Sequence, residues 1–267
     1  MFEYTYMQNA FWAVLIITPL FGLVGTMIVN NKLAFFSDAL GHSALTGIAI
    51  GALLGVTNPT LSMIIFGIAF ALLLNRIKDL KISSRDTIIS VFSSTALALG
   101  LVILSYNGNF TKFSNYLIGD ILSIAPNEIF MLLGIAIIVI AFWYFLFNKL
   151  FAISINSSLA RSKNIQVRLI EDIFIVLVAI IVMFSIRWVG ILIINSLLIL
   201  PAASSRNISR NMRQYTFWTI VFAIFSGMTG LIISFYALTA TGPTIVLISS
   251  IIFFITYLLR KKSEDWF

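Results

Sequence analysis

Cysteine is absent from this 267-residue sequence, and histidine occurs only once. Without cysteine the chain has no disulfides, no thiolate metal sites and no thiol catalysis, so oxygen and nitrogen atoms must hold any metal. A P-loop, an HExxH motif and a Gly-x-Ser-x-Gly motif are also missing. We therefore do not expect an enzyme, and if ATP drives any activity, a partner chain must hydrolyse it.

Charged residues are scarce, at 10% of the chain against about 25% in soluble domains, while 60% of the residues are hydrophobic. Such a composition is typical of an integral membrane protein. The apolar runs are long and do not alternate with polar residues, which excludes a barrel and favours helices. The sequence therefore predicts an all-α, polytopic transmembrane protein surrounded by membrane lipid, with no soluble domain.

About 20 apolar residues cross a hydrocarbon core of about 30 Å. Breaks at charged residues and at Pro, Gly and Asn clusters define nine candidate membrane segments. They are Ala10–Val29, Ala39–Val56, Thr60–Leu74, Ile88–Ser105, Ile129–Phe147, Ile173–Ile186, Val189–Ala203, Tyr215–Leu238 and Thr244–Leu259. Because Val189–Ala203 is short and ends near Pro201, it also fits a broken or re-entrant helix, so the sequence allows eight or nine crossings.

The net charge of +7 comes from lysines and arginines in short loops between the apolar segments. This is the topological bias of membrane proteins and not a nucleic-acid-binding pattern. The clustered basic residues are Lys32; Arg76, Lys78, Lys81 and Arg85; Lys149, Arg161, Lys163 and Arg168; Arg206, Arg210 and Arg213; and Arg260, Lys261 and Lys262. With nine crossings they share one side, opposite Lys112 and Arg187, and we expect that side and the C-terminus to be cytoplasmic. The N-terminus is then extracytoplasmic, unless one of the first three segments is re-entrant.

Two loops are long enough to contact partner proteins. Asn107–Glu128 is polar and faces outward, which makes it a candidate contact for an external partner. Asn148–Asp172 faces inward and alternates charged with apolar residues, and we expect a short interfacial helix around Ser158–Leu169. Ordinary solvated connectors are the alternative for both loops.

Asp38 is the one carboxylate that opens an apolar segment, and His42, the only histidine, follows four residues later. Side chains at i and i+4 lie on one face of a helix, so this carboxylate and imidazole can converge on one zinc, manganese or ferrous ion. Two ligands do not complete a coordination shell, which also needs water, other side chains, or the same pair from a second subunit across a two-fold axis. The alternative is structural: Asp38 caps the helix, and His42 hydrogen-bonds to it among packed helices.

A stripe of small residues follows this pair. Gly47, Gly51 and Gly55 recur every four residues. Because small residues allow two helices to approach closely, the stripe predicts tight helix packing.

The stretch SDALGHSALTGIAIGALLG, which contains Asp38 and His42, resembles the signature of bacterial metal-ion ABC importer permeases, the zinc, manganese and iron uptake family. Further matches to this family follow in order along the chain. They are RDTIISVFSSTALALGLVI, NYLIGDILSI, SLARSKNIQVRLIEDIF, RWVGILIINSLLILPAASSR and GLIISFYALTATGPTIVLI. Each match is weak alone, but the ordered set is specific and spans nearly the whole chain.

The resemblance implies a fold similar to that of type II ABC-importer permeases, with residues 1–267 as a single transmembrane permease domain in the bacterial inner membrane. It implies a homodimer with a central pathway, cytoplasmic ABC ATPase subunits and an extracytoplasmic metal-binding protein that delivers zinc, manganese or iron. The metal is the transported substrate, and no permanently bound cofactor is implied. The Asp and His of the family signature belong to a metal site in the pathway, and they correspond to Asp38 and His42.

The segment SLARSKNIQVRL is similar to the family's coupling helix, which docks on the ATPase, and Ala160 to Leu169 would form it here. The residues implied in this contact are Ala160, Arg161, Lys163, Asn164, Ile165 and Leu169. Gly41 and Thr46 stand where the family commonly has serine and proline, which puts metal preference in question. Asn164 stands where glycine is usual, and because Asn tolerates a left-handed backbone, we expect little change there.

Three rival functions make different demands on the sequence. An importer permease for a siderophore or cobalamin would not need the metal-ligating His42. An ion-coupled secondary carrier would need intramembrane acidic relays and inverted repeats, and apart from Asp38 the sequence shows neither. A membrane-embedded enzyme would need a nucleophile beside a base, and no such arrangement is evident.

Overall fold

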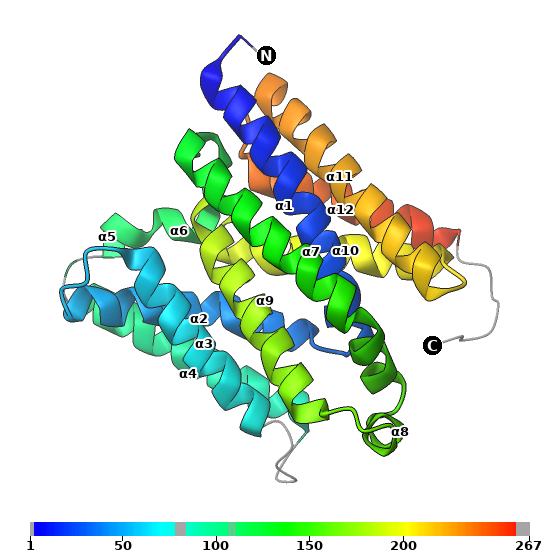
Figure 1. Cartoon of the computed structure of the whole chain (residues 1–267). Coiled ribbons are helices and arrows are strands. Elements are labelled where there is room, and N and C mark those ends of the chain that lie inside the picture. The colour runs from blue at the N-terminus through cyan, green and yellow to red at the C-terminus, as the bar shows by residue number, and fades with distance from the viewer. Residues whose placement is uncertain (1–2, 78–83, 107, 109, 260–267) are drawn as a thin grey trace. The chain divides into compact units, whose positions relative to one another are not determined.

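The computed structural model describes residues 3–77, 84–106, 108 and 110–259, and every regular element in them is helical (Figure 1). The long helices are α1 (Thr5–Asn30), α2 (Ala34–Leu53), α3 (Pro59–Ile77), α4 (Arg85–Tyr106), α7 (Pro126–Ile155), α9 (Val167–Val189), α10 (Ile191–Ile208), α11 (Met212–Ala237) and α12 (Thr241–Leu258). The short elements are α5 (Phe110–Phe113), α6 (Asn115–Ile118), the 3-10 helix η1 (Ile121–Ser123) and α8 (Ser157–Ser162). The all-α prediction is confirmed.

Eight of the long helices have the length and the apolar composition to cross a membrane, in agreement with the predicted multi-pass architecture. The exception is α2, whose hydropathy is lowered by Asp38, His42 and several serines and glycines. Most residues of α2 are nevertheless buried among other helices. The predicted second segment therefore exists as a helix that neighbouring protein largely covers, with Asp38 and His42 left partly exposed.

The boundary between α9 and α10 lies at Gly190, which has a φ of 91° that L side chains rarely adopt. The predicted segment Val189–Ala203 is therefore wrong at both ends. Its first residue belongs to α9, and α10 continues through Pro201 to Ile208. Proline is tolerated inside membrane helices, so α10 is a continuous helix and not a broken one.

The chain folds into two compact units. The first consists of Met1–Asn31, Asp120–Trp143 and Ser196–Phe267. In this unit α1 packs along α11, and α11 packs against α12 (Figure 1). A methyl group on Gly227 of α11 would lie 2.5 Å from Cγ2 of Thr18 in α1, and one on Gly230 would lie 2.5 Å from Cγ1 of Ile245 in α12. The absence of side chains at these glycines is what allows the three helices to pack so closely.

The second unit consists of Lys32–Gly119 and Tyr144–Asn195. Helix α2 lies in its interior, in contact with α3, α4 and α9. Gly100 of α4 lies against the backbone of α2, where a methyl group on it would be 2.6 Å from the amide nitrogen of Thr46. The Thr46 hydroxyl donates a hydrogen bond to the carbonyl of Ala96 in α4. These contacts hold α2 and α4 side by side.

The predicted glycine stripe is correct for two of its three members. Gly47 and Gly51 face α3, and a methyl group on Gly47 would lie 3.0 Å from the Cα atom of Met63. Gly55 lies beyond the end of α2, has a φ of 71° and has open space where a methyl group would be. It therefore forms part of the turn that follows the helix and does not contribute to helix packing.

The outer loop predicted at Asn107–Glu128 contains α5, α6 and η1, although residues 107 and 109 lie outside the described part of the chain. Within the second unit α6 packs against α9. The backbone of Gly119, just after α6, lies directly against that of Gly190 at the end of α9. This part of the loop is therefore attached to a long helix.

An ion pair joins the end of α3 to the start of α9 in the second unit. Nη2 of Arg76, at the end of α3, lies 2.7 Å from Oδ2 of Asp172, near the start of α9. Asn75 donates a hydrogen bond to the other carboxylate oxygen of Asp172 over 2.6 Å. Arg187 lies at the opposite end of α9. The loop and tail residues Lys78, Lys81, Arg260, Lys261 and Lys262 lie outside the described residues, as does the side chain of Arg85.

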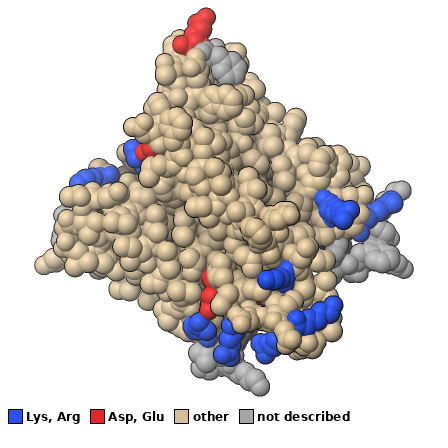
Figure 2. Space-filling view, in the orientation of Figure 1, with Lys and Arg blue, Asp and Glu red and all other residues tan. Residues whose placement is uncertain are grey.

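The outer surface of α7 is apolar. Large side chains on this helix are more than half exposed, namely Phe130, Met131, Ile137, Ile138, Ile140, Tyr144, Phe145 and Ile155. Figure 2 shows few charged residues on the visible face of the molecule. Exposed apolar surface on this scale is unfavourable in water and stable in hydrocarbon, which agrees with a membrane protein.

Candidate functional site

Asp38 and His42 lie on successive turns of α2. The helix begins at Ala34, with Leu33 at the N-cap and no side-chain capping bond, so Asp38 lies inside the helix. The alternative interpretation, in which Asp38 caps the helix, is therefore wrong. Oδ2 of Asp38 and Nε2 of His42 are 3.5 Å apart, beyond the usual hydrogen-bond distance of about 2.7–3.2 Å. The two groups share one face of the helix, as their spacing predicts, without being locked together.

Both side chains are partly open to their surroundings. The side chain of Asp38 is 45% exposed and that of His42 is 26% exposed. Nδ1 of His42 is buried and has no hydrogen-bond partner. Because buried polar atoms are nearly always paired, this imidazole has unused capacity to bind water or a cation.

Asn195 of α10 supports the Asp38 carboxylate. Its Nδ2 donates a hydrogen bond to Oδ1 of Asp38 over 3.3 Å. The hydroxyl of Ser37 contacts the amide oxygen of Asn195, which directs the amide nitrogen toward Asp38. Oδ1 is therefore held by α10, and Oδ2 faces His42.

The Asp38 and His42 pair borders a cavity of about 180 Å³ between α2 and α4. Its lining residues are Phe35, Asp38 and His42 of α2 and Ser90, Ser93, Ser94 and Leu97 of α4. The α4 residues recur at the three- and four-residue spacings that place side chains on one helix face. The cavity thus combines one carboxylate, one imidazole and three hydroxyls.

Two departures from the family signature lie outside this cavity. Gly41 faces α10, where a methyl group on it would lie 3.4 Å from the carbonyl oxygen of Ile191. Thr46 faces Ala96 of α4 through its hydroxyl. Neither residue lines the cavity, so they act on helix packing around it.

One copy of the chain supplies too few ligands for a closed metal site. Within the described residues no group of three or more His, Cys, Asp or Glu side chains is placed to hold a metal ion. Zinc sites in proteins have four ligands, and octahedral ions have six. A metal ion bound by Asp38 and His42 would therefore need water or another chain to complete its shell.

The segment implied in ATPase coupling forms α8 and the turn after it. Asn156 caps α8, accepting hydrogen bonds from the amides of Ser158 and Leu159. The single helix expected over Ser158–Leu169 is wrong, because α8 ends at Ser162 and α9 begins at Val167.

The implied contact residues are divided between these elements. Ala160 is buried in α8, whereas Arg161 and Lys163 are exposed. Asn164 has a φ of 59°, the left-handed conformation expected of a residue that replaces glycine. Ile165 is half-buried, and Leu169 is exposed on the first turn of α9. The segment presents two cations on a sharply turned backbone.

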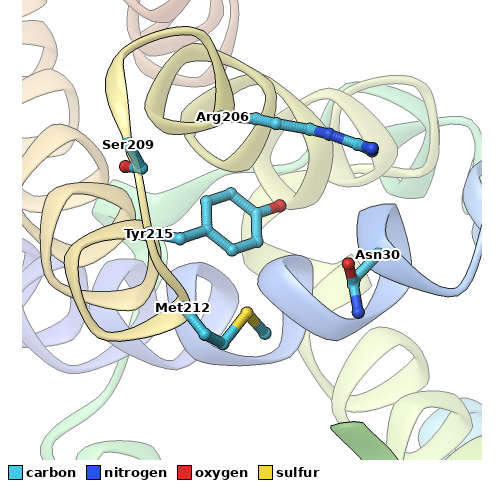
Figure 3. Close-up of a pocket in the computed structure, with 5 residues that line it drawn as sticks. All are labelled: Asn30, Arg206, Ser209, Met212 and Tyr215. Atoms are coloured by element: carbon cyan, nitrogen blue, oxygen red, sulfur yellow. The ribbon is translucent and has the colours of Figure 1, made fainter. Parts of the chain in front are cut away.

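A second cavity lies in the first unit and is too small for a substrate. It is lined by Asn30, Arg206, Ser209, Met212 and Tyr215 (Figure 3). Its volume of about 10 Å³ has room for at most one water molecule. Figure 3 shows the Tyr215 hydroxyl directed toward the space between Arg206 and Asn30, and this hydroxyl donates to the carbonyl of Thr26 over 3.5 Å. We therefore place the candidate site in the second unit.

Sequence patterns do not single out Asn195 or the three serines. The signal for Asn195 is a polar residue inside the apolar run of α10. The signal for the serines is their recurrence at positions 90, 93 and 94 of one helix. Both signals are common in helices. These residues can be assigned to the site only from the structure, where contacts of α2 with α4 and α10 place them beside Asp38 and His42.

Comparison with known proteins agrees with the predicted fold and family. The high-affinity zinc uptake system membrane protein ZnuB of Haemophilus influenzae is 32% identical over 241 residues, which cover 90% of this chain and 92% of the relative. The manganese transport system membrane protein MntC of Listeria monocytogenes is 26% identical, over 97% of this chain and 92% of the relative. The solved structure of PsaBC from Streptococcus pneumoniae in complex with Fab matches with a TM-score of 0.85 and 26% identity, over 97% of this chain and 94% of that one. The family model described as ABC 3 transport family matches residues 3–260, and the chain belongs to this family.

Proposed function

We propose that this chain is the permease subunit of an ATP-binding-cassette importer for a divalent transition-metal ion, namely zinc, manganese or iron. The observation that carries the proposal is the open Asp38 and His42 pair, which faces a polar cavity in a member of a transport family. Oxygen and imidazole nitrogen together suit these ions. The relatives named for zinc and manganese uptake support the same substrate class.

The size of the cavity favours an ion over a chelate. A volume of about 180 Å³ corresponds to roughly six water molecules at about 30 Å³ each. Sites for drug-sized ligands have about 300–1,000 Å³. A siderophore or cobalamin would also leave the imidazole of His42 without a role.

We place the translocation pathway between two copies of the chain. Asp38 and His42 from each copy would supply four ligands, the number that zinc prefers. A two-fold axis is the commonest symmetry of soluble oligomers and brings the same residues of both copies together. The two compact units of each copy would then form one permease domain.

We assign ATP hydrolysis to a partner chain, because the relatives are named as membrane proteins of uptake systems and this sequence has no P-loop. The ATPase would dock on α8 and the turn after it. There Arg161 and Lys163 offer exposed charges, Asn164 sets the turn, and Ala160 anchors the segment. Ile165 and Leu169 would add apolar contact. From the distribution of basic residues along the sequence, we assign both this segment and the C-terminus to the cytoplasmic side of a bacterial inner membrane, with a metal-binding protein delivering the ion from outside.

Metal uptake by variant cells tests the proposal. We expect Asp38→Ala and His42→Ala each to reduce accumulation of radiolabelled zinc and manganese to the level of cells that lack the chain, because half of the ligand pair is gone. Ser43→Ala is the matched control, since the Ser43 hydroxyl bonds to the carbonyl of Leu40 within α2. All variants should reach the membrane in equal amounts. Normal accumulation in the Asp38 and His42 variants would rule out this site.

A further inference from the structure

Three serines of α4 face the same cavity as Asp38 and His42. Ser90, Ser93 and Ser94 lie at positions i, i+3 and i+4, so their side chains project from one face of the helix. Thr46 and Gly100 fix this face beside α2 through close backbone contact. The position of the serines is therefore set by the same packing that holds the metal pair.

The hydroxyls of these serines are not used inside the helix. Elsewhere in the membrane helices a hydroxyl usually donates to a carbonyl of the preceding turn, as in Ser43 to Leu40 and Thr95 to Val91, both over 2.8 Å. No such bond joins the three serines to any described residue. Three hydrogen-bonding groups are therefore directed at the cavity without a protein partner.

Water molecules can form hydrogen bonds with these hydroxyls when the cavity is polar and large enough to hold them. A volume of about 180 Å³ fits roughly six molecules at about 30 Å³ each. Ser90 and Ser94 are exposed and Ser93 is buried, so the cavity is polar and open at its rim, where water can enter. An ion that binds Asp38 and His42 consequently has space, and hydrogen-bonding partners, for several of its own waters.

We propose that Ser90, Ser93 and Ser94 hold water molecules of the transported cation, so that the ion binds Asp38 and His42 while still partly hydrated. Each metal-bound water donates a hydrogen bond to a serine oxygen. The site then suits an ion that takes oxygen ligands and water in an octahedral shell, such as manganese. This inference rests on the proposed function and specifies the hydration state of the bound ion.

Manganese binding to the purified complete importer tests the inference, with Mn²⁺ itself as the probe. Electron paramagnetic resonance measures the bound ion, and water-proton relaxation counts the waters that it retains. We expect bound Mn²⁺ to retain water in the wild type. We expect the triple variant with Ser90→Ala, Ser93→Ala and Ser94→Ala to bind Mn²⁺ about tenfold more weakly, since each hydrogen bond contributes a few-fold in affinity. Alanine favours the helix, so the variant should fold.

Two controls complete the experiment. Thr95→Ala removes a neighbouring hydroxyl that is bonded within α4, and it should bind Mn²⁺ like the wild type. Ser94→Thr in the otherwise triple-alanine background restores one hydroxyl and should recover part of the affinity. Unchanged affinity in the triple variant, bound Mn²⁺ without water, or no Mn²⁺ binding at all would each overturn the inference.

The outcome can be separated from that of the proposed function. If Asp38→Ala abolishes metal uptake while the serine variants behave like the wild type, the importer site stands and the hydrated-ion inference fails. If Asp38→Ala leaves uptake intact, the proposed function itself fails.

Discussion

Asn195 holds the Asp38 carboxylate in a fixed orientation at the edge of the cavity. The two residues are 157 positions apart in the sequence, yet the amide of Asn195 donates to Oδ1 of Asp38 over 3.3 Å. Because Asn195 also contacts Ser37, its orientation does not depend on the ion. A carboxylate that is positioned in advance loses less freedom when it binds a ligand.

Replacing Asn195 by leucine should weaken metal uptake. A hydrogen bond to a charged group contributes about 1.5–3 kcal/mol, and the partial exposure of Asp38 places this bond at the low end. We expect kcat/KM for metal uptake to fall about tenfold, with normal amounts of protein in the membrane. Asn207→Leu is the control, because Asn207 lies on the same helix and donates to Thr256 instead. Equal kcat/KM values in the two variants would contradict a positioning role for Asn195.

The sequence predicts the Asp38 and His42 pair but not its surroundings, for a physical reason. Residues four apart in one helix must share a face, so local spacing is enough to bring carboxylate and imidazole together. Asn195 and the α4 serines reach the pair only through packing between helices that are distant in the chain. That packing depends on small-residue contacts such as Gly100 against Thr46, which no local pattern specifies.

At the scale of helices, close contact between α2 and α4 is what creates the cavity wall. Gly100 makes this approach possible, because even one methyl group there would lie 2.6 Å from the amide nitrogen of Thr46 and 3.0 Å from its Cα atom. Backbone atoms cannot move aside as a flexible side chain can, so the helices would have to separate.

Gly100→Ala should therefore destabilise the protein despite the better helix propensity of alanine. Overpacking costs about 1–3 kcal/mol, and replacing glycine in a helix returns at most about 1 kcal/mol. We expect the apparent Tm of the detergent-solubilised protein to fall by a few degrees. Gly134→Ala in α7 is the matched control, because no atom lies within 4 Å of the added methyl group. Its Tm should stay constant or rise slightly, and a similar result for Gly100→Ala would refute the packing argument.

The sequence predicts the number of long helices more accurately than it predicts where each helix begins and ends. Long apolar runs require helices in lipid, so each of the nine predicted segments corresponds to a long helix in the structure. The ends are decided by backbone contacts. Helix α9 ends at Gly190, where its backbone contacts Gly119. Helix α10 continues through Pro201, because a membrane helix accommodates proline. The interfacial helix was predicted too long because the left-handed turn at Asn164 interrupts it.

At the scale of the whole molecule, the incomplete ligand set favours a pair of chains. Asp38 and His42 would supply two ligands, and within the described residues no third carboxylate or imidazole stands near enough to join them. A second copy related by a two-fold axis would supply the same pair again. In such an assembly the mouth of the cavity, including Phe35, would lie close to the axis.

The absence of cysteine makes this arrangement directly testable, because any thiol cross-link must come from an introduced residue. Phe35 is 54% exposed and lines the cavity beside Asp38. Disulfides form when two Cα atoms lie within about 7 Å, and a short bifunctional thiol reagent extends that reach. In membranes we expect Phe35→Cys to give a cross-linked band at twice the 29.7 kDa chain mass. Phe145→Cys, at a 71% exposed position on the apolar surface of α7, should remain monomeric. Cross-linking at position 145 but not at 35 would place the contact between copies on another face, and the four-ligand site would then lose its basis.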